Sequence, residues 1–127
     1  MHIEHIALWT GQLEVLKTFY ETYFCAQAGE KYTNPKTHFE AYFLTFAGGA
    51  RLEIMQAPDV TAAEAIVRRV GFTHLAFSVG SKEQVDRLTE RLEADGYRVI
   101  GRPRTTGDGY YESVVLDPDG NRVELTI

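Results

Sequence analysis

The chain of 127 residues is long enough for one domain with a single core, and its composition is ordinary for a globular protein, with 44% hydrophobic and 24% charged residues. Its net charge of −5 disfavours a nucleic-acid partner, because neutralising phosphates requires a concentrated lysine and arginine surface. No apolar run approaches the roughly 20 residues that span a bilayer, and the first residues lack the pattern of a signal peptide. With Cys25 as the single cysteine no intrachain disulfide can form, which fits a reducing cytoplasm. We therefore expect a cytoplasmic protein without nucleic-acid or membrane partners.

The first half of the chain has the pattern of a strand, a helix and three further strands. Alternation of side chains predicts a strand near residues 3–9, with His5 facing away from its aliphatic neighbours Ile6 and Leu8. Apolar residues at helical spacing predict a helix over residues 12–25. Three further strands are predicted near residues 28–33, 39–47 and 50–56, with Gly48-Gly49 turning the last two into a hairpin.

A connecting segment, residues 58–70, separates the two halves. Pro58 breaks the preceding strand, and a capping box at Thr61-Ala62-Ala63-Glu64 predicts a short helix through Arg69. The second half then repeats the order of the first. The expected elements are a strand near residues 72–79, a helix capped at Ser81 and stopped at Gly96, and strands near residues 97–102, 110–117 and 121–127. Asp117-Pro118-Asp119-Gly120 is the turn between the last two strands.

These patterns predict one α+β domain over residues 1–127, made of two tandem βαβββ modules. The first module covers residues 1–57 and the second covers residues 71–127. A unit of this kind has one sheet face covered by its own helix and the other face open. Two such units would form curved mixed sheets around a shared cavity, with the helices on the outer faces.

The two halves carry the same pair of chemistry-bearing residues at matched positions. His5-Ile6-Ala7-Leu8 corresponds to His74-Leu75-Ala76-Phe77, and Arg51-Leu52-Glu53 corresponds to Arg122-Val123-Glu124. An internal repeat indicates one structural unit built twice. Alternation places the two histidines and the two glutamates on the face opposite the aliphatic residues, which is the open face of each sheet. Two imidazoles and two carboxylates form a mixed nitrogen and oxygen ligand set for a divalent metal ion.

A purely structural role for the same residues is the alternative. Carboxylates removed from water are costly unless a cation lies beside them. Arg51 and Arg122 could provide that cation in place of a metal ion, and the result would be two ion pairs with Glu53 and Glu124. The sequence therefore predicts either one shared metal site or two separate ion pairs.

At these residues the chain resembles the vicinal oxygen chelate superfamily, whose members pair two βαβββ modules, and the resemblance covers essentially the whole chain. The set His5, Glu53, His74 and Glu124 is similar to that of bacterial glyoxalase I, in which equivalent residues bind nickel, cobalt or zinc. The turn Asp117-Pro118-Asp119-Gly120-Asn121 before the strand that carries Glu124 is also typical of the superfamily. Related transferases and dioxygenases generally use three protein ligands, and bleomycin-binding members use none.

The resemblance implies a metal-dependent lyase or isomerase that acts on a small oxygenated substrate. Proton abstraction next to a carbonyl would give an enediolate that the metal stabilises, with Glu124 as the first choice for the base and Glu53 as the second. It also implies a homodimer in which His5 and Glu53 come from one subunit and His74 and Glu124 from the other. The alternatives are a thiol transferase or dioxygenase of the same superfamily, and a non-catalytic protein that binds a small molecule such as a drug.

Two positions depart from the glyoxalase I pattern. Trp9 stands where those enzymes typically have the arginine that holds a glutathione carboxylate, and Ala57 stands where they have an asparagine. The departures argue against glutathione as the thiol. Trp9 and Met55 are expected to line the substrate pocket. Arg104 or Tyr110 could meet an anionic group from a substrate-covering loop over residues 102–111, which could equally be a solvated connection.

Overall fold

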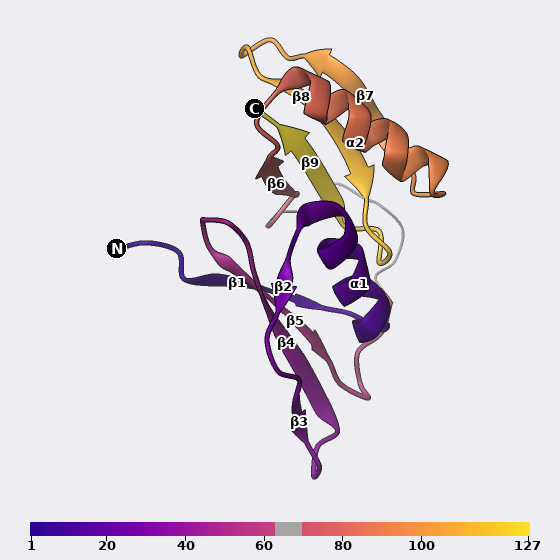
Figure 1. Ribbon diagram of the computed structural model, residues 1–127. Coiled ribbons are helices and arrows are strands. Elements are labelled where there is room, and N and C mark those ends of the chain that lie inside the picture. The colour runs from indigo at the N-terminus through magenta and orange to yellow at the C-terminus, as the bar shows by residue number, and fades with distance from the viewer. Residues whose placement is uncertain (63–69) are drawn as a thin grey trace. The chain divides into compact units, whose positions relative to one another are not determined.

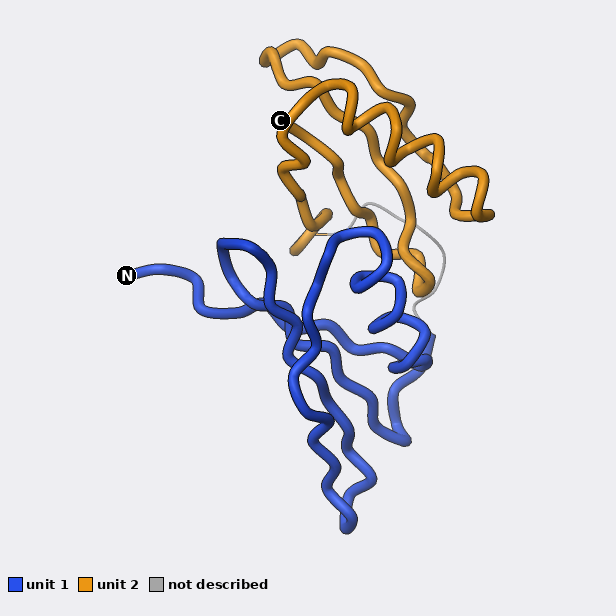
Figure 2. Tube along the Cα trace, viewed as in Figure 1, with its two compact units in different colours: residues 1–64 blue, residues 65–127 orange. Residues whose placement is uncertain are grey.

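The computed structural model describes residues 1–62 and 70–127 and divides the chain into two compact units, residues 1–64 and residues 65–127 (Figure 2). Each unit has one helix and one mixed sheet, which confirms the predicted α+β class and the tandem arrangement. The short helix predicted through Arg69 falls largely on residues 63–69, outside the described residues. No helix in the described part is long and apolar enough to cross a membrane.

The first unit follows the predicted order closely (Figure 1). Its elements are β1 (His5–Trp9), α1 (Leu13–Phe24), β2 (Gln27–Ala28), β3 (Tyr32–Asn34), β4 (Phe39–Thr45) and β5 (Arg51–Gln56). The sheet has the order β1-β5-β4-β2, and β3 also pairs with β4. β1 runs parallel to β5, whereas the other pairs are antiparallel. The first and last strands of the unit therefore lie side by side.

The core of the first unit forms between α1 and one face of this sheet. The buried helix residues recur at helical spacing, as expected for a helix that covers a sheet on one side. The buried residues that form this core are Leu13, Leu16, Phe19, Tyr20, Leu44, Leu52 and Ile54. Because successive strand residues face opposite sides, burial of Leu52 and Ile54 turns Glu53 to the face away from the helix.

The strand predicted near residues 28–33 is interrupted, so this prediction was wrong in its continuity. β2 and β3 pair with different stretches of β4, as shown by the partners Ala28 with Leu44 and Tyr32 with Ala41. Between them the Lys31 ammonium makes ion pairs with Glu14, at 3.1 Å, and Glu40, at 3.0 Å. The segment at residues 29–31 thus contacts α1 and β4 through the Lys31 side chain instead of continuing the strand.

The second unit repeats the arrangement with four strands (Figure 1). Its elements are β6 (Leu75–Ser78), α2 (Lys82–Ala94), β7 (Val99–Thr105), β8 (Tyr111–Leu116) and β9 (Arg122–Thr126), in the sheet order β6-β9-β8-β7. β6 is parallel to β9. The predicted helix start is confirmed, because the Ser81 hydroxyl accepts a hydrogen bond from the Gln84 amide at 3.3 Å. Gly96, with φ of +92°, ends the helix as predicted.

β7 is longer than the sequence predicted, because it continues through Pro103 to Thr105. Proline cannot donate to a strand ladder, but it is tolerated on edge strands and at bulges. β7 is the edge of its sheet, and its pairing with β8 shifts register between Gly101 and Arg104. The substrate-covering loop predicted over residues 102–111 is therefore reduced to a turn at residues 106–110, and Arg104 lies on a strand.

A buried aspartate fixes the turn that leads into β9. Asp117 is 4% exposed. Its carboxylate accepts hydrogen bonds from the Asp119 amide at 3.0 Å, the Asn121 amide at 2.8 Å and the Asn121 side chain at 2.9 Å. Gly120 supplies the positive φ of +82° that the turn needs. This turn sets the point at which β9 begins, and thereby which side of the sheet Glu124 faces.

Candidate metal centre

The parallel strand pair of the first unit brings His5 and Glu53 together. Ala7 is the register partner of Glu53, and His5 is two residues before Ala7 on the same face of β1. The Nε2 atom of His5 lies 3.7 Å from the Oε2 atom of Glu53. The Glu53 side chain is 18% exposed, whereas that of His5 is 40% exposed. The two side chains therefore converge on one point of the face away from α1.

The second unit builds the same pair in the same way. Ala76 is the register partner of Glu124, and His74 immediately precedes β6. The Nε2 atom of His74 lies 3.6 Å from the Oε2 atom of Glu124, with side chains 40% and 15% exposed. An alanine stands opposite the glutamate in both units, and its small side chain leaves space for the carboxylate to reach the imidazole. The sequence repeat is thus a repeat of three-dimensional geometry.

Each pair fits half of a metal-binding set. Two donors bound to one ion at about 2.0–2.2 Å lie roughly 3 Å apart in neighbouring positions, only slightly closer than the two pairs do here. Imidazole nitrogen and carboxylate oxygen are ligands that nickel, cobalt and zinc accept. Within residues 1–62 and 70–127, no cluster of three or more histidine, cysteine, aspartate or glutamate side chains is arranged to hold a metal ion. Each unit supplies two donors.

Glu4 holds His5 in the orientation that a ligand needs. Its Oε2 atom lies 2.5 Å from Nδ1 of His5, and its Oε1 atom accepts a hydrogen bond from Nε of Arg51 at 2.7 Å. The hydrogen bond from His5 and the neighbouring Arg51 guanidinium lower the pKa of Glu4. A proton on Nδ1 of His5 would leave Nε2 as an acceptor on the Glu53 side, which is the arrangement common for ligand histidines.

The arginines do not form the ion pairs that the alternative interpretation predicted. Arg51 pairs with Glu4 and stacks on the ring of Phe43, with its Cζ atom 4.1 Å from the ring centroid. Among the described residues, no ion pair joins Arg51 to Glu53 or Arg122 to Glu124. Histidine is the basic residue beside both carboxylates.

The surroundings of Glu124 shift the pKa of its carboxyl group. Burial raises its pKa above the ordinary carboxyl value, and the nearby Glu112 carboxylate raises it further, whereas His74 and Arg104 act in the opposite direction. Arg104 contacts Glu112 at 3.3 Å. A carboxylate whose charged form is disfavoured in this way gains stability from any cation placed beside it.

The comparison with known families agrees with this geometry. The family model of the Glyoxalase/Bleomycin resistance protein/Dioxygenase superfamily matches residues 2–125 of the chain. The chain belongs to this superfamily. The resemblance noted from the repeated histidine and glutamate pairs is thereby confirmed at the level of the superfamily.

Individual proteins match the chain over different shares of its length. Uncharacterized protein YqjT of Bacillus subtilis (strain 168) is 53% identical over 60 residues, which span 45% of this chain and 47% of that protein. Glyoxalase I from Zea mays has a TM-score of 0.81 at 22% identity, and the match covers 98% of this chain but only 44% of the maize chain. The structure of a possible glyoxalase from Bacillus cereus has a TM-score of 0.72 at 25% identity, with 100% and 99% of the two chains covered.

Sequence reasoning missed two residues that this superfamily member places beside the candidate ligands. Alternation over a strand beginning at residue 3 places Glu4 on the face opposite His5. In the structure its carboxylate instead contacts Nδ1 of His5 and Nε of Arg51, and its carbonyl oxygen accepts a hydrogen bond from the Arg51 amide at 2.9 Å. Glu112 shares its strand face with Val114, the register partner of Glu124. Alternation along β8 is the sequence signal for Glu112, because it places this acidic residue on the same strand face as Val114.

The predicted substrate residues fall into two groups. Trp9 and Met55 are register partners on the ligand-bearing face, and Trp9 is 53% exposed with its ring edge-on to Phe39. Arg104 lines an open pocket together with His74. Tyr110 is 54% exposed and belongs to the turn after β7, and it is not among the residues lining that pocket.

The raised pKa of Glu124 predicts a pH-dependent effect on stability. A proton held more tightly in the folded than in the unfolded chain makes folding less favourable as pH rises above the ordinary carboxyl range. Glu124→Gln should therefore make the metal-free protein more stable than the wild type at pH 7, and the difference should shrink towards pH 4. Urea unfolding in the presence of EDTA at both pH values measures this. A variant no more stable than the wild type at pH 7 would contradict the assignment.

Proposed function

We propose that this protein is a metal-dependent lyase or isomerase of the glyoxalase I type that acts on a small oxygenated substrate. The observation that supports it most is the repeated pair, with Nε2 to Oε2 separations of 3.7 Å in the first unit and 3.6 Å in the second. One such contact is common in proteins. Two such contacts at equivalent positions, each with an alanine opposite the glutamate, favour a function that requires both histidine and glutamate pairs.

In this proposal His5, Glu53, His74 and Glu124 together hold one divalent ion, which is nickel, cobalt or zinc. Four protein ligands leave two positions of an octahedron for water or substrate oxygens. A bound ion of this kind supplies Lewis-acid stabilisation of charge that develops on a substrate carbonyl oxygen. The Glu4 carboxylate contributes by fixing the ring of His5 through Nδ1, as outer partners of ligand histidines do.

Glu124 is the residue that we assign to proton transfer. Its carboxylate takes the proton from the carbon next to the carbonyl and returns it to the neighbouring carbon, with no net loss or gain of protons. Burial and the Glu112 carboxylate raise its pKa, and a carboxylate with a raised pKa is a stronger base. Glu53 occupies the equivalent position in the other unit and is the second candidate for this role.

The proposed substrate differs from that of a glutathione-dependent enzyme. Trp9 presents an exposed aromatic surface on the ligand-bearing face where glyoxalase I typically has an arginine, and Ala57 replaces an asparagine. A charge-assisted hydrogen bond to a carboxylate contributes about 1.5–3 kcal/mol, so its absence removes much of the specific recognition of glutathione. A smaller or less charged thiol, or a substrate without a thiol, fits this surface better.

A small-molecule binding protein is the second candidate function, and the open pocket of the second unit favours it. That pocket has a volume of about 570 Å³, within the range of small-ligand sites. A binding protein has no need for the histidine and glutamate pair in both units. Isomerisation of a 2-oxoaldehyde therefore distinguishes the lyase from a binding protein. It also distinguishes the lyase from a thiol transferase or dioxygenase built on the same site.

The base assignment predicts a specific loss of activity. Glu124→Gln should lower turnover by at least about a hundredfold, because positioned proton transfer contributes about 10²–10⁴ to the rate, while much of the bound metal is retained. Isomerisation of a 2-oxoaldehyde with several thiols and without thiol, together with elemental analysis, measures both quantities. Glu90→Gln, an exposed glutamate on α2, is the matched control and should keep full activity.

Two outcomes would contradict this part of the proposal. Full turnover by Glu124→Gln would exclude Glu124 as the base. A metal-loaded wild type that is inactive with every thiol and without thiol would exclude the lyase activity itself.

We further propose a homodimer in which each metal site takes one pair from each subunit. A subunit carrying His5→Gln and Glu53→Gln, co-expressed with one carrying His74→Gln and Glu124→Gln, should then form a heterodimer with one intact site. Its metal content should be half that of the wild-type dimer. Elemental analysis of the heterodimer, purified through two different tags, measures this. A wild-type protein that sediments as a monomer, or a heterodimer without metal, would contradict the shared site.

A further inference from the structure

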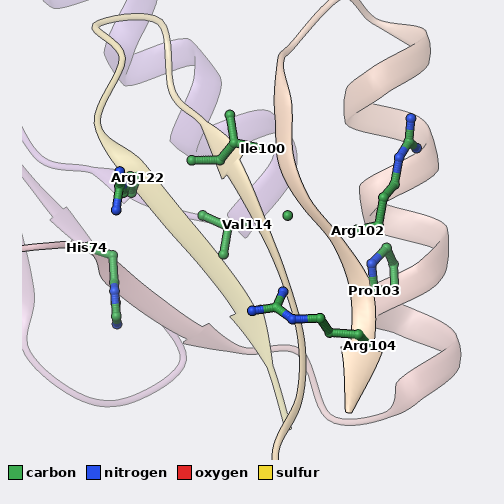
Figure 3. A pocket seen from close by; sticks show the side chains of 8 residues that line it. His74, Ile100, Arg102, Pro103, Arg104, Val114 and Arg122 are labelled. Atoms are coloured by element: carbon green, nitrogen blue, oxygen red, sulfur yellow. The ribbon is translucent and has the colours of Figure 1, made fainter. Parts of the chain in front are cut away.

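The pocket of the second unit is unusually rich in arginine. Arg102, Arg104 and Arg122 line it together with His74, Gly101 and Val114, and no acidic side chain of the described residues is part of this lining (Figure 3). All of these residues belong to the second unit. We refer to it as the arginine pocket.

The three arginines differ in how far their charge is already neutralised. Arg102 makes two hydrogen bonds to Glu93, at 2.6 and 2.5 Å, and Figure 3 shows its side chain extending in a different direction from that of Arg104. Arg104 contacts Glu112 at 3.3 Å, and its charge also acts on the Glu124 carboxylate. Arg122 is half-buried and, among the described residues, makes no ion pair or side-chain hydrogen bond. Arg122 is therefore the guanidinium most in need of a counter-ion.

In the first unit, the arginine equivalent to Arg122 is engaged by an acidic side chain and an aromatic ring. Arg51, the counterpart of Arg122, pairs with Glu4 and stacks on Phe43. In the second unit, Thr73 stands in the place of Glu4, and Val114 stands in the place of Phe43 opposite the glutamate. The exchange removes both the acidic partner and the aromatic ring. Among the described residues, the second unit therefore has a guanidinium without an acidic partner beside an open pocket, where the first unit has one that is paired and stacked.

Gly101 gives Arg104 the space to reach this pocket. A Cβ atom at Gly101 would lie 3.3 Å from Nη1 of Arg104 and 3.3 Å from Cβ of Val114, which is a tight approach on both sides. The guanidinium of Arg104 thus occupies space that a side chain at residue 101 would take. It lies beside Val114 and inside the lining of the arginine pocket.

We propose that the arginine pocket binds an oxyanion, the carboxylate or phosphate group of a small substrate, through the guanidinium groups of Arg122 and Arg104. Both groups match the two-pronged donor geometry of arginine. His74 lines the same pocket, so an anion held there lies next to a proposed metal ligand. The proposal rests on the proposed function only in naming the anion as part of the substrate, since binding itself needs no metal ion.

Binding is tested on the full chain after removal of metal with EDTA. Inorganic phosphate and acetate are titrated separately at constant ionic strength, and amide chemical shifts are followed by NMR. Shifts should concentrate on Gly101, Arg104 and Arg122, and the stronger of the two probes identifies the chemical group. Arg122→Gln should weaken binding by about tenfold or more, as expected for loss of a charge-assisted hydrogen bond.

Two further variants separate a built site from a general effect of charge. Arg102→Gln removes the same charge from the same pocket lining, but its guanidinium is held by Glu93, so binding should change by less than about twofold. Val114→Phe keeps every arginine and fills the space as Phe43 does in the first unit, so binding should be lost. The NMR spectrum of each variant also shows whether it is folded.

The proposal would be overturned if neither probe shifts these amides, or if Arg102→Gln and Arg122→Gln weaken binding equally. Its failure is distinguishable from failure of the proposed function. Phosphate or acetate binding that depends on Arg122, in a protein that neither holds metal nor turns over substrate, would keep the pocket and discard the lyase. An active metalloprotein in which Arg122→Gln leaves anion binding unchanged would keep the lyase and discard the arginine pocket.

Discussion

The parallel pairing of the first and last strands of each unit is the constraint on which the site depends. His5 and Glu53 lie far apart in the sequence, as do His74 and Glu124, and β1–β5 and β6–β9 place them side by side. A slip of one residue in either register would turn the glutamate towards the helix, because side chains alternate between the two faces of a strand. The hydrophobic residues that flank each glutamate in sequence, such as Val123 and Leu125, are fully buried and hold the register. The packing of the core thus decides where the carboxylates lie.

The two units share this strand pairing, but the charged groups around their histidines differ. Around His5 the charged side chains pair with one another, because Glu4 contacts both the imidazole and Arg51. The second unit has Thr73 at the position of Glu4, and Glu112 on β8 and Arg104 on β7 act on the Glu124 carboxylate instead. In the proposed function, the first unit would hold a fixed ligand and the second unit would carry the carboxylate that transfers the proton, beside the proposed place for an anion. Two identical ion pairs would lack this asymmetry.

The order of helices and strands could be predicted from the sequence because its signals are local. The Ser81 cap, the Gly96 stop and the turn at Asp117 each depend on residues close in the chain, and all three are confirmed. The extent of β7 could not be predicted, because tolerance of Pro103 follows from its place at the edge of the sheet. The contacts of Glu4 with His5 and Arg51 were missed because alternation places adjacent residues of a strand on opposite faces. Convergence of the four ligands on one ion stays a prediction.

The two pairs share the same electrostatic feature, a carboxylate with little access to water beside an imidazole. Glu53 and Glu124 are largely removed from water, and each faces an imidazole at a distance longer than a hydrogen bond. A metal ion between the pairs would supply the charge that these carboxylates lack. The most direct test is X-ray absorption spectroscopy of nickel-loaded protein, combined with the number of ions per chain. One ion per chain with two imidazoles among ligands at about 2.0–2.2 Å is the predicted result. Two ions per chain with one imidazole each, or a bound ion without imidazole ligands, would contradict it.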